Sequence, residues 1–141
     1  VGFIFQSYNL IPVLNVAENI ALPMSLDNQE VDQDYLSELL AILGLTDRRD
    51  YYPHQLSGGQ QQRVAIGRAL IAKPKLLLAD EPTGNLDSRN SREIVTLLQN
   101  SVRKYNQTLL LITHDGHVAA HADRVLHMLD GRLWDGAEEG V

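Results

Sequence analysis

The sequence contains no cysteine, no long apolar run and no excess of positive charge, and each absence excludes a class of function. Without cysteine, the chain forms no disulfide, no thiolate metal site and no cysteine nucleophile. The longest unbroken apolar run is the five-residue stretch Leu39 to Leu43. A membrane-spanning helix needs about 20 such residues. The formal net charge of −6 argues against a general binder of nucleic acid or of anionic membranes.

What is present is the composition of a soluble globular domain. Over 141 residues, 44% are hydrophobic and 21% are charged, which suffices for one modest domain with its own core. The opening segment does not have the pattern of a signal peptide. It begins without methionine on VGFIF, an apolar stretch that predicts a strand already under way. We therefore expect a fragment of a longer protein.

The hydrophobic pattern predicts a helical segment followed by alternating helices and strands. Asn15 and Glu18 have the spacing of a capping box at a helix start. We expect helical structure over 15–45, 58–72, 88–104 and 117–121. We expect strands over 1–5, 76–80, 108–113, 124–129 and 132–134. The inner strands are apolar on both faces, as in parallel strands covered by helices, and Asp130-Gly131 predicts a terminal hairpin. The fold class is therefore α/β, with a mostly parallel sheet and a helical insert.

Two glycines open the predicted helix over 58–72, in the stretch LSGGQ. A capping box of Ser57 and Gln60 explains those two residues. It does not explain Gly58 and Gly59, because glycine weakens a helix by about 1 kcal/mol relative to alanine. A helix start carries unpaired N–H groups and a partial positive charge. Without side chains there, an anion such as a phosphate can reach the backbone, and we favour this interpretation.

Acidic residues and a histidine follow the apolar strands. Asp80 ends the strand LLLAD, Glu81 comes next, and His114 follows LLLIT. The carboxyl ends of parallel strands form the ligand-binding edge of α/β sheets. An aspartate there can hold Mg²⁺ against nucleotide phosphates, and a neighbouring glutamate can orient or deprotonate water. The alternative is that these side chains only cap the turns and the helix that follow.

These stretches together resemble the ATP-binding subunit of an ABC transporter. The segments that match are, in the family's order, Gln6 in FIFQ, LSGGQ (56–60), LLLADEP (76–82), GNLD (84–87) and His114 in ITHD. FQSYNLIPVLNVAENIALP and ADEPTGNLD look most like the branch that serves lipoprotein release, macrolide efflux and antimicrobial-peptide export. The resemblance implies a partial P-loop NTPase core.

The resemblance assigns a role to each motif. It implies Mg²⁺ contacts for Asp80 and Gln6, water activation for Glu81, and a contact to the γ-phosphate for His114. The nucleotide-binding residues that it implies are Gln6, Leu56, Ser57, Gly58, Gly59, Gln60, Asp80 and Asp87. ATP and Mg²⁺ are accordingly expected in the intact subunit, which would be an ATPase.

The same resemblance implies partners and a location. Two ATPase subunits pair head to tail with two ATP molecules between them, so Ser57, Gly58 and Gly59 would meet a phosphate held by the partner. Asp87 would reach across that dimer. Three segments are expected: strand and loop over 1–14, a helical subdomain over 15–55 that docks on a transmembrane permease, and the rest of the core over 56–141. The subunit would lie on the cytoplasmic face of the cell membrane, without inserting into it and without binding nucleic acid.

One departure from the family pattern limits this expectation. The phosphate loop Gly-x-x-x-x-Gly-Lys-Ser/Thr is missing, because no Gly-Lys pair exists in the sequence. We therefore expect little ATP affinity and no turnover from these 141 residues alone. The resemblance implies a parallel sheet in the order 1–5, 76–80, 108–113, phosphate-loop strand and 124–129. The missing strand would therefore belong between 108–113 and 124–129. Either the sheet closes over that gap, or a second chain supplies pairing, and we favour the dimer.

Two other classes of function stay open. One is a soluble ABC-type ATPase of translation or DNA repair. Only 49 residues separate Gln6 from Leu56, which disfavours repair members because they carry a long coiled coil there. The other is a non-catalytic interaction module.

Overall fold

The computed structural model describes residues 1–135, and its elements follow the predicted alternation. In chain order they are β1 (Gly2–Phe5), α1 (Val16–Leu26), α2 (Gln33–Ile42), η1 (Thr46–Arg48), η2 (Pro53–Gln55), α3 (Gly58–Leu70), β2 (Leu76–Asp80), α4 (Ser88–Lys104), β3 (Thr108–Ile112), α5 (Gly116–Ala119), β4 (Leu126–Leu129) and β5 (Arg132–Asp135). The predicted α/β class is confirmed. The bounds differ from the predicted ones by one or two residues at most elements, and the helical segment is divided over 27–32.

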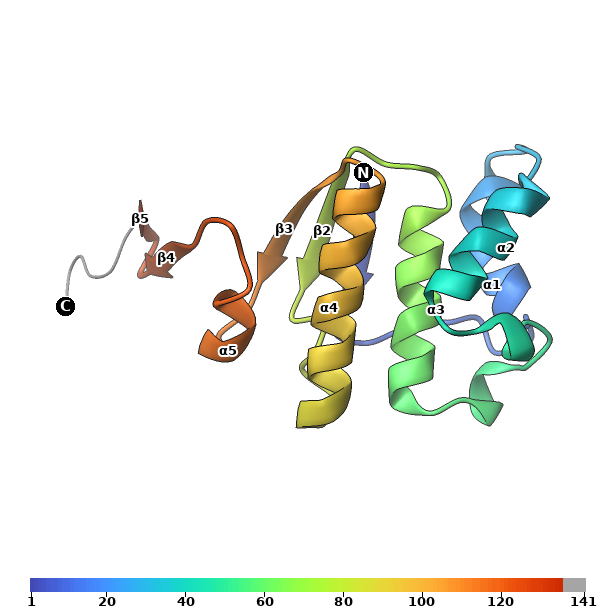
Figure 1. The fold of residues 1–141 in the computed structure, drawn as a ribbon, viewed down its shortest axis with the longest axis horizontal. Coiled ribbons are helices and arrows are strands. Elements are labelled where there is room, and N and C mark those ends of the chain that lie inside the picture. Colours follow the sequence, from blue (N-terminus) through green and yellow to red (C-terminus); the bar gives the residue numbers. More distant parts are fainter. Residues whose placement is uncertain (136–141) are drawn as a thin grey trace.

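A three-stranded parallel sheet in the order β1-β2-β3 forms the centre of the molecule (Figure 1). Ile4 lies opposite Ala79, and Ala79 lies opposite Leu111. Helices α3 and α4 lie over one face of this sheet (Figure 1). Ile4, Leu77 and Ala79 point to that face and are buried with at most 1% of their surface exposed. The predicted order of these three strands is confirmed.

The prediction that helices cover both faces is wrong for the described residues. Exposed side chains on the other face are Phe3 (51%), Phe5 (44%), Leu110 (53%) and Ile112 (58%). The cause is topological. Each strand is added on the same side of the preceding one, and crossovers between parallel strands are right-handed. Both connecting helices therefore fall on the same face.

The C-terminal strands form a separate hairpin. β4 and β5 pair antiparallel with each other through Leu129 and Arg132, as Asp130-Gly131 predicts. Among residues 1–135, neither strand pairs with β3, so the sheet does not close over the gap. To pair with β3, β4 would have to lie about 4.8 Å from it. That movement would pull α5 and its buried Val118 out of place. The predicted dimer stays a prediction.

The helical segment joins the sheet through α3. A capping box starts α1, since Glu18 N–H donates to Asn15 Oδ1 (2.8 Å) and Asn15 N–H donates to Glu18 Oε1 (2.9 Å). Helix α1 packs on α3 at Gly67, where a β-carbon would lie 3.0 Å from Ile20 Cδ1.

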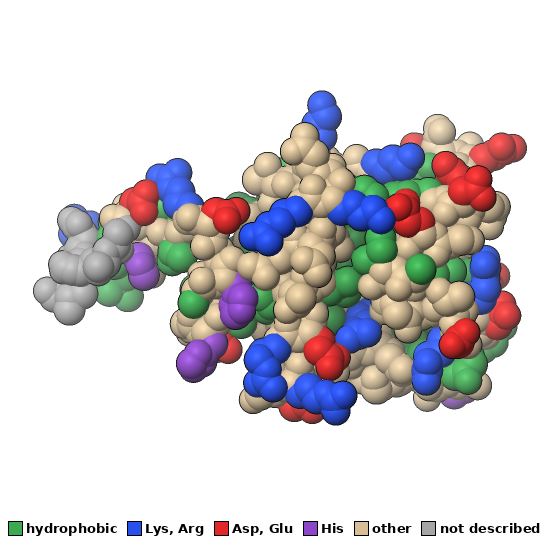
Figure 2. Space-filling view, in the orientation of Figure 1, with side chains coloured by type: hydrophobic (Ala, Val, Ile, Leu, Met, Phe, Trp, Pro, Cys, Tyr) green, Lys and Arg blue, Asp and Glu red, His purple; other side chains and the backbone are tan. Residues whose placement is uncertain are grey.

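Figure 2 shows basic and acidic side chains interspersed over the helical face, without a large patch of one sign.

Candidate functional site

The parallel sheet brings three predicted site residues to one edge. Gln6 follows β1, Asp80 ends β2, and His114 lies two residues beyond β3. Phe5 pairs with Asp80, and Asp80 pairs with Ile112, so the three strand ends are level. This is the edge at which open α/β sheets bind ligands.

Glu81 and His114 are in direct contact at this edge. Glu81 Oε1 accepts a hydrogen bond from the backbone N–H of His114 (3.0 Å) and contacts the ring Nδ1. Thr113 Oγ1 donates to Glu81 Oε2 (3.4 Å). The Glu81 side chain is only 20% exposed, whereas that of His114 is 89% exposed. The glutamate is therefore held by its surroundings while the histidine ring faces outward.

The backbone of Glu81 lies in the left-handed region, with φ of 47°. Its N–H nevertheless donates to the carbonyl of Ile112 (2.9 Å), which extends the ladder one residue beyond β2. A left-handed non-glycine residue costs roughly 1–3 kcal/mol and persists only where the structure determines it strongly. At Glu81 the bond to Ile112 and the hydrogen bonds from His114 and Thr113 hold this conformation.

The donor set at the edge suits Mg²⁺. Asp80 is exposed and offers carboxylate oxygens. Gln6 donates through Nε2 to Asn85, which leaves its amide oxygen as an acceptor. Oxygen ligands are those that Mg²⁺ prefers, and the ion usually shares them with nucleotide phosphates. Within residues 1–135, no group of three or more acidic or histidine side chains makes a metal site by itself.

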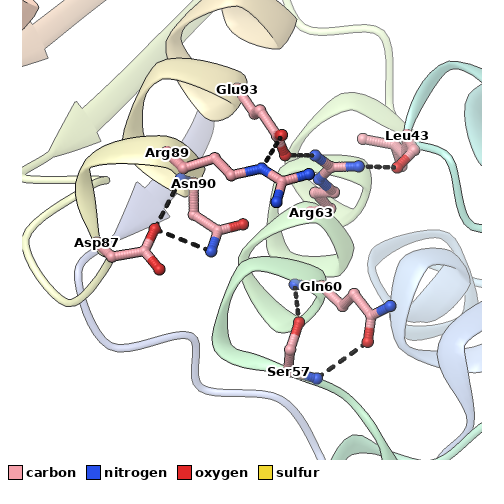
Figure 3. A network of polar contacts seen from close by, with 8 residues as sticks. All are labelled: Leu43, Ser57, Gln60, Arg63, Asp87, Arg89, Asn90 and Glu93. Atoms are coloured by element: carbon pink, nitrogen blue, oxygen red, sulfur yellow. Dashed lines mark hydrogen bonds and ion pairs between the residues drawn. The ribbon is translucent and has the colours of Figure 1, made fainter.

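The LSGGQ segment starts α3 as its spacing predicts. Ser57 Oγ accepts from Gln60 N–H (3.2 Å), and Gln60 Oε1 accepts from Ser57 N–H (3.0 Å), as Figure 3 shows. Leu56 is buried beneath the turn, while Ser57 and Gly58 are exposed. The first N–H groups of a helix lack intrahelical partners, so this start can receive an anion.

Gly59 has a packing role that the sequence did not indicate. It is buried, and a β-carbon there would lie 2.6 Å from Asn90 Oδ1 in α4. Asn90 is itself fixed by Asp87, whose Oδ1 accepts from its N–H (2.8 Å) and its Nδ2 (3.1 Å). The start of α3 therefore lies directly against the start of α4, which follows the GNLD motif (Figure 3).

Two arginines on α3 hold neighbouring segments through contacts that the sequence does not indicate. Arg63 pairs with Glu93 of α4 (2.8 Å) and donates to the carbonyl of Leu43 (3.3 Å), as Figure 3 shows. Arg68 donates to the carbonyls of Tyr8 (2.7 Å) and Asn9 (2.8 Å). Burial lowers the pKa of the Arg68 guanidinium. These contacts fix α4 and the segment after Gln6 on the same helix.

Two amides were also missed, Gln62 and Asn85. Gln62 is fully buried and lies with Ile66 and Ala69 at the helical spacing of a core stripe. A glutamine within this apolar stripe indicates a buried polar side chain with hydrogen-bond partners, and this signal could have identified Gln62. Asn85 contacts Gln6, but nothing in the sequence indicates a contact across 79 residues.

Comparison with known proteins agrees with this geometry. The family model described as "ABC transporter" matches residues 1–84. The lipoprotein-releasing system ATP-binding protein LolD of Bordetella avium is 43% identical, over 96% of this chain and 60% of its own length. The macrolide export ATP-binding/permease protein MacB of Wolinella succinogenes is 49% identical, over 94% of this chain and 21% of its own. The chain belongs to the ABC transporter family, as an ATP-binding domain of which it covers part.

A solved structure confirms the fold. The dimeric post-hydrolysis state of the ATP-binding cassette MJ0796, bound to ADP and Pi, superposes with a TM-score of 0.78 at 38% identity, covering 95% of this chain and 62% of that one. The predicted ABC ATPase fold is thereby confirmed. The chain spans about 60% of the length of LolD. Among the described residues, none of the helices has the length and apolarity to cross a membrane.

Proposed function

We propose that this chain is part of the motor subunit of an ABC transporter, in which ATP hydrolysis drives transport across the membrane or extraction from it. The observation that carries the proposal is the contact of Glu81 with His114 beside Asp80, at the ligand-binding edge of the sheet. The names of the relatives, a lipoprotein-releasing ATP-binding protein and a macrolide exporter, support the export branch. The ADP and Pi of the related cassette support ATP as the substrate.

Each residue at the edge has a task in that reaction. Glu81 is fixed by backbone and side-chain donors, so its carboxylate can orient a water molecule and receive its proton. The exposed ring of His114 can donate to a γ-phosphate oxygen. Asp80 and the amide oxygen of Gln6 would hold Mg²⁺. When bound, that ion neutralises charge on the phosphates.

The start of α3 supplies the other half of a nucleotide site. The Ser57 hydroxyl oxygen accepts from Gln60, so its proton is available to a phosphate. Gly58 exposes backbone beside it. Two copies that pair head to tail would each offer this helix start to the ATP of the other, with Asp87 near the same boundary. The dimeric state of the related cassette supports this pairing.

Coupling to a membrane partner completes the proposal. Residues 1–14 carry Gln6, 15–55 form the helical surface that would dock on a transmembrane permease, and 56–141 carry the remaining motifs. MacB, whose name joins an ATP-binding part with a permease, supports such a partner. The subunit would lie at the cytoplasmic face of the membrane. Because the sequence has no Gly-Lys phosphate loop, the 141 residues alone should not turn over ATP.

A charge placed at the start of α3 tests the proposal. Gly58→Asp, made in the subunit that contains this chain, puts a carboxylate where the partner's phosphate would arrive. An aspartate at the first turn suits the helix dipole, so α3 should still form. Gly58→Asn is the matched control, since its side chain has the same shape without the charge and its β-carbon would lie at the same 3.2 Å from Tyr8 Oη.

Sedimentation with and without ATP reads out this experiment. We expect ATP to promote self-association of the wild type and of Gly58→Asn. Gly58→Asp should weaken that association by about tenfold or more, because like charges brought together cost several kcal/mol. ATP-dependent association that is equal in both variants would refute the proposed role of the helix start.

A further inference from the structure

Two reciprocal hydrogen bonds join Gln6 to Asn85, and we call this pair of bonds the clamp. Gln6 Nε2 donates to Asn85 Oδ1 (3.2 Å), and Asn85 Nδ2 donates to the backbone carbonyl of Gln6 (3.1 Å). One bond fixes the side chain and the other fixes the backbone. Both residues are exposed, so each would otherwise populate several rotamers.

Gly84 provides the surface on which the Gln6 side chain lies. A β-carbon at position 84 would stand 2.6 Å from Gln6 Nε2 and 2.7 Å from its Cδ. Any side chain at position 84 would therefore displace the glutamine. The turn itself is closed by Gly84 N–H donating to the carbonyl of Glu81 (3.1 Å). The same turn thus connects the site of Gln6 to that of Glu81.

A second, buried set of contacts connects the end of β1 with the segment 82–85. The buried amide of Gln62 donates through Nε2 to the carbonyl of Phe5 (3.2 Å) and contacts the carbonyl of Pro82. These residues are the neighbours of Gln6 and Glu81 in the chain. The end of β1 and the segment 82–85 are therefore held together at two levels, of which only the Asn85 contact touches the Gln6 side chain.

We propose that Asn85 is a positioning residue, which holds Gln6 so that its amide oxygen stays available to Mg²⁺ beside Asp80. The inference rests on the proposed function. Asn85 uses the Nε2 group of Gln6, which leaves the oxygen of the same amide available as a ligand. Losing the clamp would let the glutamine sample other rotamers. The loss of one net hydrogen bond corresponds to an affinity for Mg²⁺ that is about two- to tenfold weaker.

The first test measures the clamp directly, in the 141-residue chain without nucleotide. The ¹⁵N side-chain amide resonance of Gln6 is recorded for the wild type and three variants. Asn85→Ala should move it to the position of a solvated glutamine, whereas Asn85→Asp should leave it closer to the wild-type position, because the carboxylate still accepts from Nε2 although the bond from Nδ2 to the Gln6 carbonyl is lost. Asn100→Ala, an exposed asparagine in α4, is the matched control and should leave it unchanged. An unchanged resonance in Asn85→Ala overturns the proposal.

The second test measures the Mg²⁺ concentration for half-maximal ATP hydrolysis by the subunit that contains this chain. We expect Asn85→Ala to raise it about two- to tenfold, with Asn85→Asp closer to wild type and with little change in melting temperature. A loss of stability with an unchanged Mg²⁺ requirement means a purely structural role and overturns the proposal. If the wild-type subunit does not hydrolyse ATP, the proposed function fails, and the role of Asn85 toward Mg²⁺ fails with it. The resonance still decides whether the clamp exists.

Discussion

Replacing Gly67 by alanine tests how closely α3 packs on the helical segment. A β-carbon at this position would lie 2.7 Å from Leu43 Cδ1 and 3.0 and 3.1 Å from two side-chain atoms of Ile20. Contacts below 3.0 Å force a displacement. Both neighbours are fully buried, with 0% of their surface exposed, so their side chains have no solvent to move into.

Two effects of opposite sign decide the outcome. Alanine is the better helix former by about 1 kcal/mol in a helix interior. One extra methyl group in a well-packed core costs about 1–3 kcal/mol through shifted side chains. The overpacking exceeds the gain in propensity, because the neighbours are methyl and methylene groups of the core itself. We expect Gly67→Ala to lower the free energy of unfolding by about 1 kcal/mol.

Urea unfolding followed by circular dichroism measures this change, with the denaturant slope expected to stay constant. Gly116→Ala is the control, because a β-carbon there meets nothing within 4 Å. That variant should be as stable as the wild type or more stable, by up to about 1 kcal/mol. A Gly67→Ala chain at least as stable as Gly116→Ala would refute the packing argument.

Three further predictions concern a buried tyrosine, the open sheet edge and coupling. Tyr35→Phe removes the hydrogen bond to the carbonyl of Leu70 (3.0 Å) and should cost about 1 kcal/mol in urea unfolding at neutral pH. Burial, and then the charge of Glu38, raise the pKa of Tyr35 to about 12 from 10.0. The folded state therefore holds the tyrosine proton more tightly than the unfolded chain, and wild-type stability should fall as pH rises from 10.0 to about 12, less so in Tyr35→Phe. The chain should sediment as a dimer at micromolar concentration through the edge of β3 that has no partner strand within residues 1–135, and Leu110→Lys should shift it toward monomer; a monomeric wild type would contradict this. In the intact subunit, Gln6→Ala should weaken partner-stimulated ATP hydrolysis but leave ATP affinity nearly unchanged, and equal losses of both would contradict its coupling role.

The strands and helices were predictable because each has a local signal. The Asn15–Glu18 capping box and the Asp130-Gly131 turn each lie within four residues, and the structure forms both as expected. The site edge was also predictable, because parallel strands must bring Asp80 and His114 to the same end. The assignment of the chain to the ABC transporter family from its motifs is confirmed by the family match.

What could not be predicted depends on contacts between distant segments. The alternation of apolar residues is the same whether one or both faces of a sheet are covered, so it does not show that Phe3 and Ile112 are exposed. Asn85 contacts Gln6 across 79 residues, and no periodicity carries that information. The packing of Gly59 on Asn90 likewise depends on how two helices approach, which their separate sequences do not specify.

The most direct test of this account is steady-state ATP hydrolysis by the intact subunit with Glu81→Gln. The substitution removes the carboxylate that accepts from His114 but leaves the shape of the side chain. Exposed Glu30, changed to glutamine, is the control. We expect Glu81→Gln to lower turnover by about 10²–10⁴-fold, with nucleotide binding retained, and Glu30→Gln to match the wild type. Turnover by Glu81→Gln within twofold of the wild type, in the same assay, would contradict the assignment of this edge as the site of ATP hydrolysis.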